Sequence, residues 1–349
     1  MRSCLALLAL LAACSSSTPP ADAEPPLTGA TSLKCPAPGA LPFRLASSGF
    51  QRAANKTTAS DDPTSKDEAS DTIGNPGGKL ASVYLADDQS PSTAPIGYHG
   101  VKARAMPTNG IVAAALPGEH VSLWFYDATK AAWQSLGRAT TDDSGAYDLD
   151  ATGLIAPNGQ PVYAMLEADG SCAAHFDYLL APGSKVVVTD IDGTLTLSDA
   201  ELINQLSAEA TYVPKRMGAA DQLTQAWAAK GYPVVYLTAR PHKYRAETRG
   251  WLAGQGFASG PLITEGSTAT ADVYKTLWLS RMIQDLGWNV VAAYGNAPTD
   301  VTAYKNAGIP PGQTFIIGGL TDVGSDVVIP NNDFSQHITS YVMAQPANQ

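Results

Sequence analysis

The feature that most constrains the fold is an alternation, after residue 185, of short apolar segments with segments of helical periodicity. The apolar segments are rich in β-branched and aromatic residues, which favours strands. Between them, apolar residues recur three and four positions apart, which favours amphipathic helices. We expect strands at residues 186–189, 233–237, 289–294 and 314–317, and helices at residues 219–229 and 275–286. Apolar strands that alternate with helices predict a parallel sheet covered on both faces.

Polar residues directly follow three of these expected strands. Asp190 follows the first, Thr238 follows the second, and Gly295 and Asn296 lie at the end of the third. Ligands of parallel α/β sheets bind in the crevice at the carboxyl ends of the strands. We therefore expect a functional site at this edge of the sheet.

The string Asp190-Ile191-Asp192-Gly193-Thr194 places two carboxylates at that edge. Neighbouring carboxylates repel each other unless a cation or hydrogen-bond donors compensate, and Mg²⁺ prefers oxygen ligands. One aspartate could attack phosphorus as a nucleophile, the other could act as general acid and base, and Gly193 would let the backbone approach a phosphate closely. The alternative is an Asp-rich turn that caps a helix. The complete string after a Val-rich strand favours the chemical interpretation.

Residues 190–199 and three later stretches, in order 236–240, 274–276 and 292–305, resemble the motifs of the haloacid dehalogenase superfamily of phosphotransferases. More narrowly, they resemble the catalytic domain of lipins, the Mg²⁺-dependent phosphatidate phosphatases. The resemblance covers about residues 185–320 and does not extend into the region before it. It implies a Rossmann-like parallel sheet of the haloacid dehalogenase type, with Mg²⁺ as the cofactor.

The resemblance implies catalytic roles for four residues. Asp190 would be the nucleophile and a Mg²⁺ ligand, and Asp192 would be the general acid and base and bind Mg²⁺ through its backbone carbonyl. Thr238 would donate to a phosphate oxygen, and Lys275 would offset the negative charge on the phosphorylated aspartate. Lys275 has independent support, because it lies on the apolar face of its expected helix, where an ammonium group needs a partner such as Asp190. The alternatives are a hydroxyl that caps the next helix for Thr238 and a surface lysine at a frayed helix end for Lys275.

The resemblance also implies the remaining site residues. Asn296 and Asp300 would complete or orient the metal shell. Gly193, Thr194 and Arg240 would bind the substrate. For Asn296 and Asp300 the alternative is an ordinary turn followed by a helix N-cap.

The charge balance bears on the partners. The chain has 22 Lys and Arg residues against 32 Asp and Glu residues, a net charge of -10, which argues against a nucleic-acid partner. One local cluster is basic, with Glu247 among its members: Arg240, His242, Lys243, Arg245 and Arg249. It could hold an anionic headgroup beside the phosphate site. A solvated helix face explains every member except Arg240 equally well.

The first half of the chain has a different composition. Residues 14–78 are polar and rich in Ser, Pro, Ala, Asp and Thr, which indicates a tether followed by an irregular loop. Short strand patterns such as residues 121–126 and 162–166 then predict a small β-sandwich domain. The expected organisation is a signal peptide at 1–13, the tether and loop at 14–78, a β-sandwich at 79–180, the phosphatase-like domain at 181–330 and a C-terminal tail at 331–349.

The first residues indicate an envelope protein. A charged residue and an apolar run of nine residues, too short to span a bilayer, are typical of a secretory signal peptide. Residues 11–14 resemble a bacterial lipobox, which implies cleavage before Cys14, acylation of its thiol and a place in the outer membrane. An ordinary signal peptide with an incidental Cys14 is the alternative. Cys35 and Cys172 could then form a disulfide in an oxidising compartment, or remain two thiols.

These observations predict a Mg²⁺-dependent phosphomonoesterase that works through an aspartyl-phosphate intermediate at a phospholipid membrane surface. Phosphatidate is the leading substrate that the resemblance implies. Three alternatives remain: a module that binds or senses phosphatidate without cleaving it, a phosphatase of a soluble phosphomonoester, and a chain whose β-rich domain acts in adhesion or docking beside a vestigial phosphatase fold.

Overall fold

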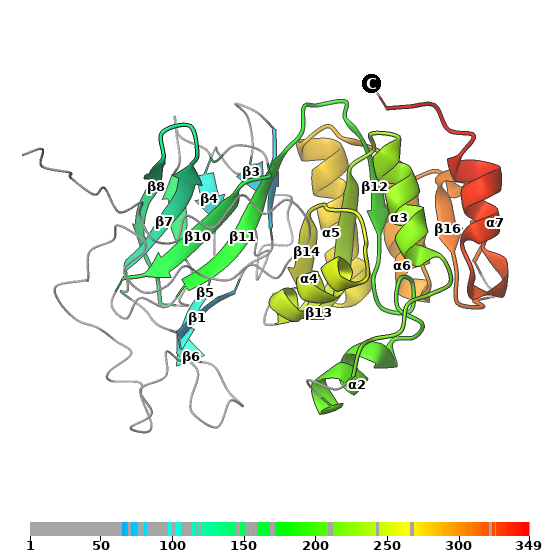
Figure 1. Ribbon diagram of the computed structural model, residues 1–349, viewed down its shortest axis with the longest axis horizontal. Helices are drawn as coiled ribbons and strands as arrows, with labels where there is room; N and C mark the ends of the chain where they lie inside the picture. Colours follow the sequence, from blue (N-terminus) through cyan, green and yellow to red (C-terminus); the bar gives the residue numbers. More distant parts are fainter. Residues whose placement is uncertain are drawn as a thin grey trace, which may run out of the picture.

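The structure of the chain is a computed structural model. It describes residues 118–348, apart from short gaps, together with several strands and their neighbours before residue 118 (Figure 1). The gaps are residues 119, 144–146, 151–155, 157–158, 168–171, 209–211, 242–243, 266–268, 321–322 and 325, and the earlier described stretches are residues 65–68, 71–75, 80–81, 97–99, 102–105 and 114–115.

A six-stranded parallel sheet lies in the second half of the chain, as the apolar segments predict. Its strand order is β14-β13-β12-β15-β16-β17, and every neighbouring pair is parallel. The strands are β12 (Lys185–Thr189), β13 (Val234–Pro241), β14 (Leu262–Glu265), β15 (Asn289–Gly295), β16 (Thr314–Ile316) and β17 (Val327–Val328). All four expected strands are confirmed, and β14 and β17 are additional.

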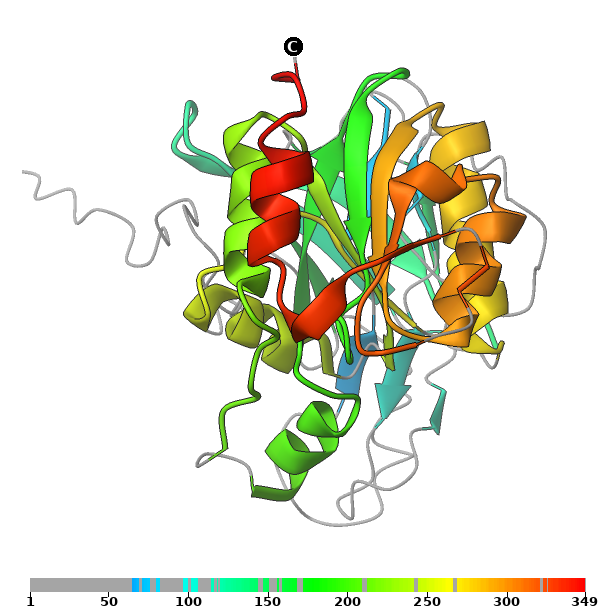
Figure 2. The ribbon, with the colours of Figure 1, turned by 90° about the vertical axis from the view of Figure 1, so that its right-hand side faces the viewer.

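Helices cover both faces of this sheet, because alternate residues of its strands enter two apolar clusters (Figure 2). In β12, Val186 and Val188 face one cluster and Val187 faces the other. The cluster with Val187 contains residues of α3 (Ala220–Ala229) and α4 (Arg245–Gly254). The other contains residues of α5 (Ala271–Ser280), which continues as the π-helical turn η3 (Arg281–Asp285), and of α6 (Pro298–Asn306). No described side chain of helix α2 (Ala200–Ala208) belongs to either cluster, and this helix projects away from the sheet (Figure 2). The expected helix at 219–229 is confirmed as α3. The one expected at 275–286 begins four residues earlier, as α5.

The first half of the chain contains a second six-stranded sheet, in the order β3-β2-β11-β10-β7-β8. Its pairs are antiparallel except for the parallel pair of β2 and β11. The strands are β2 (Thr72–Gly74), β3 (Leu80–Ala81), β7 (His120–Asp127), β8 (Ala132–Thr140), β10 (Pro161–Leu166) and β11 (Cys172–Leu179). Two small sheets accompany it, formed by β1 (Ser65–Glu68), β5 (Lys102–Ala105) and β6 (Ala114–Ala115), and by β4 (Gly97–His99) and β9 (Asp148–Asp150). The β-rich character is therefore confirmed, and a two-sheet sandwich stays a prediction.

Two predicted boundaries are wrong. The segment expected as an irregular loop contains β1 and β2, and Ile73 of β2 is fully buried among residues of the parallel-sheet domain. The expected C-terminal tail folds back onto the same domain through α7 (Ser335–His337) and η6 (Ile338–Val342). Phe334 and Val342 are completely buried there, so apolar burial holds this segment in place.

The predicted leader lies outside the described residues. This applies to the signal peptide at residues 1–13, to acylation of Cys14 and to Cys35, so the proposed disulfide with Cys172 stays a prediction. Among the residues that the structure does describe, no helix combines the length and the apolar character that crossing a bilayer requires.

The two halves meet at a buried polar junction that should be sensitive to acid. His175 of β11 is buried near Arg245 and Arg249 of α4, with Asp177 Oδ1 3.6 Å from its Nε2. Burial, and then the two arginine charges, lower the pKa of His175 to about 3. The unfolded chain protonates this histidine below about pH 6.5, whereas the folded chain does not until about pH 3. The contribution of His175 to the free energy of unfolding is therefore most favourable above pH 6.5 and becomes less favourable as the pH falls towards 3.

We expect the free energy of unfolding to fall by ~1.4 kcal/mol per pH unit between pH 6 and pH 4 on account of His175 alone. Urea titrations of the wild type and His175→Gln over this range measure the contribution as a difference in slope. His337, whose pKa burial lowers to about 4, adds a similar term to both proteins and cancels in the comparison. Equal slopes in the two proteins would contradict the assignment.

Candidate functional site

The candidate site lies at the carboxyl edge of the parallel sheet, where β12 ends and the chain turns sharply. The backbone amide of Asp190 still donates to the carbonyl of Tyr294 on β15 over 2.9 Å. The next residues then form a tight turn, in which the amides of Leu195 and Thr196 both donate to the carbonyl of Ile191. This turn holds Asp190 and Asp192 at the position that the strand-end rule predicts.

Gly193 is the residue that permits this turn. Its φ of +73° lies in the left-handed region, and a Cβ atom placed on it would lie 2.1 Å from Asn296 Nδ2 and 2.6 Å from Asp199 Oδ1. A glycine is therefore required for both the conformation and the close approach of the Asn296 loop. The structure thus gives a packing reason for Gly193 besides its predicted contact with substrate.

A buried lysine joins two carboxylates beside this turn. Lys275 Nζ, on α5, donates to Asp190 Oδ1 over 2.8 Å and to Asp300 Oδ1 over 2.6 Å. All three side chains are at most 6% exposed. The structure therefore brings Lys275 and Asp190 together, as the apolar-face argument predicts, whereas their catalytic roles stay predictions.

This triad carries one more negative charge than positive charge and has almost no access to water. Burial, against the opposing effect of Lys275 and together with the carboxylates of Asp300 and Asp192, raises the pKa of Asp190 to about 7. Burial alone would lower the pKa of Lys275, but the charges of Asp190 and Asp300 outweigh it and raise that pKa above its usual range. A further cation beside Asp190 would relieve this excess of negative charge.

Three acceptor oxygens converge next to Asp190. Asn296 Oδ1 lies 2.8 Å from the backbone oxygen of Asp192 and 3.3 Å from Asp190 Oδ2. Neighbouring ligand oxygens of Mg²⁺ lie about 2.9 Å apart when the Mg–O distances are 2.0–2.1 Å in an octahedron. Rotating the Asn296 amide would instead direct its NH₂ group at the same oxygens and satisfy them without a cation. Only the orientation with Asn296 Oδ1 towards Asp190 and Asp192 offers a donor set for Mg²⁺, which then consists of one carboxylate, one amide and one carbonyl oxygen.

Carboxylates alone do not make this site. Within the part of the chain that the structure describes, no three His, Cys, Asp or Glu side chains gather where they could hold a metal ion. Asp300, expected at the metal shell, is completely buried, and its Oδ2 accepts hydrogen bonds from the amides of Asn296 and Ala297, at 3.0 Å each. Asp300 therefore orients the loop that carries Asn296. It caps the helix, as the alternative interpretation requires, and it also has the orienting role that the resemblance implies.

Asp192 forms a bidentate ion pair with Arg240. Arg240 Nε donates to Asp192 Oδ2 over 2.8 Å, and Nη2 donates to Oδ1 over 2.7 Å. Arg240 was expected to bind substrate, but its buried guanidinium instead contacts the predicted general acid. Thr194, the other expected substrate residue, donates from Oγ1 towards Asp190 Oδ2 at 3.2 Å and Asn296 Oδ1 at 3.0 Å.

Thr238 differs from its prediction in position. Strand β13 continues to Pro241, with a shift of register against β14 between Leu237 and Pro241, so Thr238 lies within the strand rather than directly after it. Its side chain is completely buried, and its Oγ1 accepts a hydrogen bond from the amide of Arg240 over 3.2 Å. In this structure Thr238 supports the backbone that positions Arg240.

The expected basic surface patch is wrong for its described members. Arg245 is buried and donates from Nη2 to the carbonyl of Ala174 on β11, and Arg249 is buried and paired with Asp71. His242 and Lys243 lie outside the described residues. The positive charge of α4 therefore binds the β-rich half of the chain and is not available to a lipid headgroup.

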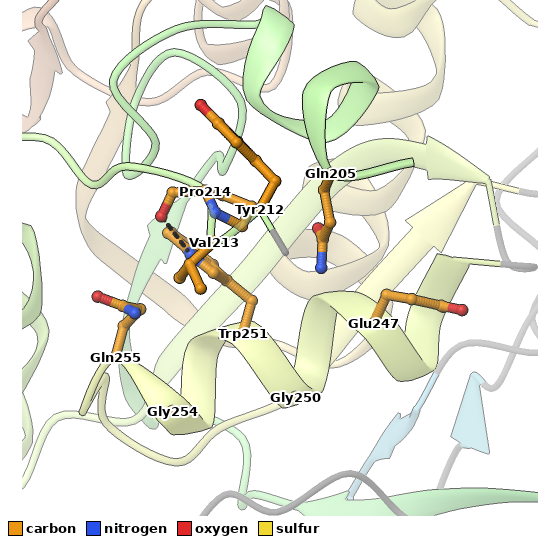
Figure 3. Close-up of a pocket in the computed structure, with 9 residues that line it drawn as sticks. All are labelled: Gln205, Tyr212, Val213, Pro214, Glu247, Gly250, Trp251, Gly254 and Gln255. Atoms are coloured by element: carbon orange, nitrogen blue, oxygen red, sulfur yellow. Dashed lines mark hydrogen bonds between the residues drawn. The ribbon is translucent and has the colours of Figure 1, made fainter. Parts of the chain in front are cut away.

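A separate open cavity of about 620 Å³ lies between α4 and the segment after α2 (Figure 3). The indole of Trp251 donates to the carbonyl of Pro214 at its edge over 2.9 Å. Its lining residues are Gln205, Tyr212, Val213, Pro214, Glu247, Gly250, Trp251, Gly254 and Gln255. They include none of the predicted site residues, so the cavity is distinct from the carboxylate cluster.

Comparison with known proteins supports the lipin-like interpretation. Residues 187–318 match the family model described as PITM 1-3, LNS2 domain. The LNS2 domain is a lipin-like domain related to the haloacid dehalogenase phosphatases. The matched stretch contains the turn at Asp190, the lysine at 275 and the loop at Asn296.

The chain is also similar to membrane-associated phosphatidylinositol transfer proteins and to protein retinal degeneration B, of which three examples follow. The chain is 28% identical over 207 residues to human membrane-associated phosphatidylinositol transfer protein 1, covering 58% of this chain and 16% of that protein. It is 28% identical over 211 residues to mouse membrane-associated phosphatidylinositol transfer protein 3, covering 59% of this chain and 21% of that protein. It is 25% identical over 228 residues to Drosophila melanogaster protein retinal degeneration B, covering 64% of this chain and 17% of that protein. The chain thus corresponds to about a fifth or less of each relative.

These alignments extend beyond the parallel-sheet domain. Residues 187–349 make up less than half of the chain, so an alignment over 58% of it includes residues before 187. The family model itself covers residues 187–318, which agrees with the predicted extent of about 185–320, whereas the relatives share residues before 187 as well. Part of the β-rich region is shared with these relatives together with the candidate site.

Proposed function

We propose that this chain hydrolyses a phosphomonoester through an aspartyl-phosphate intermediate on Asp190, with a divalent cation as cofactor. One observation carries the proposal: the Asp190 carboxylate lies between the ammonium group of Lys275 and a set of oxygens whose spacing suits Mg²⁺. Asp192 follows two residues later, at the same strand end. The haloacid dehalogenase type of fold is part of this proposal, and the match to a lipin-like domain supports it.

The reaction has two displacements at phosphorus. The Asp190 carboxylate attacks the phosphorus atom, the bond from phosphorus to the ester oxygen breaks, and Asp192 gives a proton to the departing alkoxide. Asp192 then takes a proton from water, and that water attacks the phosphorus and displaces the Asp190 carboxylate. The products are the alcohol and inorganic phosphate, and both aspartates return to their starting state.

The surrounding residues stabilise charge during these steps. Lys275 stays beside Asp190 when a phosphoryl group is added, so its ammonium group balances the added negative charge. Thr194 orients the Asp190 carboxylate through its hydroxyl, and Asp300 fixes the loop that carries Asn296. Asp190, Asn296 and the Asp192 carbonyl would hold Mg²⁺, which when bound supplies positive charge for the phosphate oxygens.

A lipid phosphate is the substrate class that we propose, with phosphatidate first. The names of the human and mouse relatives describe membrane-associated proteins that handle a phospholipid, which supports a lipid phosphomonoester at a membrane surface. Acylation of Cys14 in a bacterial outer membrane would place the site beside such lipids and is part of the proposal.

A second function, phosphatidate binding without cleavage, is favoured by one specific contact. Both oxygens of Asp192 accept hydrogen bonds from Arg240, so the predicted acid has a partner before any substrate binds. If Asp192 serves only this ion pair and gives no proton to a leaving group, the site would hold a phosphate but not complete the reaction.

Phosphate release from phosphatidate in phosphatidylcholine vesicles, from glycerol 3-phosphate and from p-nitrophenyl phosphate separates these functions. We expect Mg²⁺-dependent release that EDTA abolishes and that is fastest with the vesicles. Faster release from glycerol 3-phosphate would support the soluble-substrate alternative. Mg²⁺-dependent sedimentation with phosphatidate vesicles, but no phosphate release from any substrate, would overturn the catalytic proposal in favour of binding.

A further inference from the structure

Helix α4 carries three polar side chains on the stripe that faces the protein interior. Arg245, Thr248 and Arg249 are spaced three and four residues apart, and each is at most 9% exposed. The two arginines reach towards the β-rich half, whereas Thr248 reaches towards the candidate site. One helix face therefore contacts both halves of the chain (Figure 1).

Asp71, the residue before β2, fixes α4 to both sheets. Its Oδ1 accepts a hydrogen bond from the amide of Phe176 on β11 over 3.0 Å. Its Oδ2 accepts one from the amide of Leu262 on β14 over 2.8 Å, and also binds Arg249 Nη2. The Asp71 amide in turn donates to the carbonyl of Leu262 over 3.2 Å. This carboxylate is completely buried, so its partners hold it in one position.

Thr248 links helix α4 to Asp192, the predicted general acid, through Arg240. Its Oγ1 donates to the carbonyl of Tyr244 over 2.8 Å, which leaves a lone pair that accepts from Arg240 Nη1 over 3.0 Å. The same guanidinium binds both oxygens of Asp192. Because a guanidinium is planar and rigid, these contacts fix where the Asp192 carboxyl lies.

We propose that Asp71 of the β-rich half positions the catalytic acid Asp192, through Arg249 and Thr248 on α4 and then through Arg240. The β-rich half thus contributes to catalysis, because one of its residues helps to position Asp192. The proposal rests on the proposed function for its catalytic consequence, and its structural part, the placement of Arg240 by α4, stands without it. Asp71, Arg249, Thr248 and Arg240 are positioning residues, since none of them is required to touch the reacting atoms.

The chemical consequence is selective. A displaced Asp192 delivers its proton poorly to an alkoxide, and a misplacement of about 1 Å can cost about 100-fold in rate. A p-nitrophenolate group leaves without needing that proton. A change in this network should therefore slow the first displacement far more for alkyl phosphates than for aryl phosphates. The ratio kcat/KM reports this step, because the alcohol leaves in it, whereas the later attack of water, in which Asp192 takes a proton, is the same for every ester. A general loss of structure would lower kcat/KM for both equally.

Two variants of the full chain test the network at different points. Thr248→Val removes the hydroxyl with little change of volume, and Thr248→Ser restores it as the matched control. The double variant Asp71→Asn with Arg249→Met removes both buried charges together, because a single change would leave an unpaired buried charge and endanger folding. For both variants we expect kcat/KM for the alkyl phosphate to fall about tenfold and kcat/KM for p-nitrophenyl phosphate to fall less than threefold.

A measurement independent of activity follows the Arg240 side chain. The ¹H–¹⁵N NMR signal of Arg240 Nε–H, identified by its loss in Arg240→Lys, reports the bond to Asp192. We expect its hydrogen exchange with water to accelerate at least fivefold in Thr248→Val and in the double variant, and to stay at the wild-type rate in Thr248→Ser.

The outcomes separate the two proposals. A wild-type protein that releases no phosphate from any ester overturns the proposed function, while the Arg240 signal still decides the positioning network. Folded variants with wild-type Nε–H exchange overturn the network whether or not the protein is active. Equal losses of kcat/KM for alkyl and aryl phosphates, beside faster Nε–H exchange, overturn the claim that the network acts through the proton delivered by Asp192.

Discussion

The variant Asp190→Asn is expected to lose phosphate release by at least roughly 10³-fold while it stays folded. The amide has no anionic oxygen to attack phosphorus, so the first displacement cannot begin. Folding should survive because Lys275 keeps its second partner, Asp300 Oδ1 at 2.6 Å. The substitution also removes one of two buried negative charges that share a single lysine, and a buried charge that is removed no longer costs desolvation energy on folding. Phosphate release and the thermal unfolding midpoint, measured on the same sample, check both parts.

Asp143→Asn is the matched control, because it makes the same chemical change at an exposed residue of the β-rich half. It should leave both activity and unfolding unchanged. Wild-type turnover in a folded Asp190→Asn protein would exclude Asp190 as the nucleophile and with it the two-displacement mechanism.

The parallel sheet could be predicted because each of its strands is recognisable from its own short stretch of sequence. A strand that is buried on both faces appears as a continuous apolar run, and β12 and β15 are runs of this kind. Lys275 could be predicted for a related reason. A charged residue on the apolar face of a helix indicates a buried partner, and the structure supplies Asp190 and Asp300.

The junction between the halves could not be predicted from local pattern. Arg249 lies 178 residues from its partner Asp71, which sits in a polar segment with the composition of a loop. The basic residues after Thr238 therefore indicated a surface patch, whereas the structure uses them internally. One signal was present in the sequence: Arg245, Thr248 and Arg249 share a stripe with Leu252, which places them on the inward face.

The loop after β15 shows why a structural and a functional interpretation of one motif need not compete. Asp300 makes the hydrogen bonds to loop amides that the helix-cap alternative requires, and it also binds the lysine of the site. The cap places Asn296 where its side chain meets Asp190 and the carbonyl of Asp192. Sequence alone gave both interpretations separately because it does not show that one carboxylate has enough acceptor positions for both.

The second large effect is expected for Lys275→Met, in stability as well as in activity. Removing the ammonium group leaves Asp190 and Asp300 as two buried carboxylates with no cation between them. Breaking a buried ion pair from one side typically costs about 3–5 kcal/mol, and we expect a loss of that size in the free energy of unfolding at pH 8. Phosphate release should fall roughly 10²-fold or more, because the charge that balances the phosphorylated aspartate is gone.

Two further variants separate the structural loss from the chemical one. Lys305→Met, at an exposed position near the end of α6, removes the same charge and should change neither quantity. The double variant Lys275→Met with Asp300→Asn removes one stranded carboxylate but keeps an oxygen for the loop amides, so it should recover much of the lost stability. It should remain inactive, because the lysine acts on Asp190 and not only on folding. If the double variant regained phosphate release together with stability, Lys275 would be a structural residue and the proposed charge balance at Asp190 would be wrong.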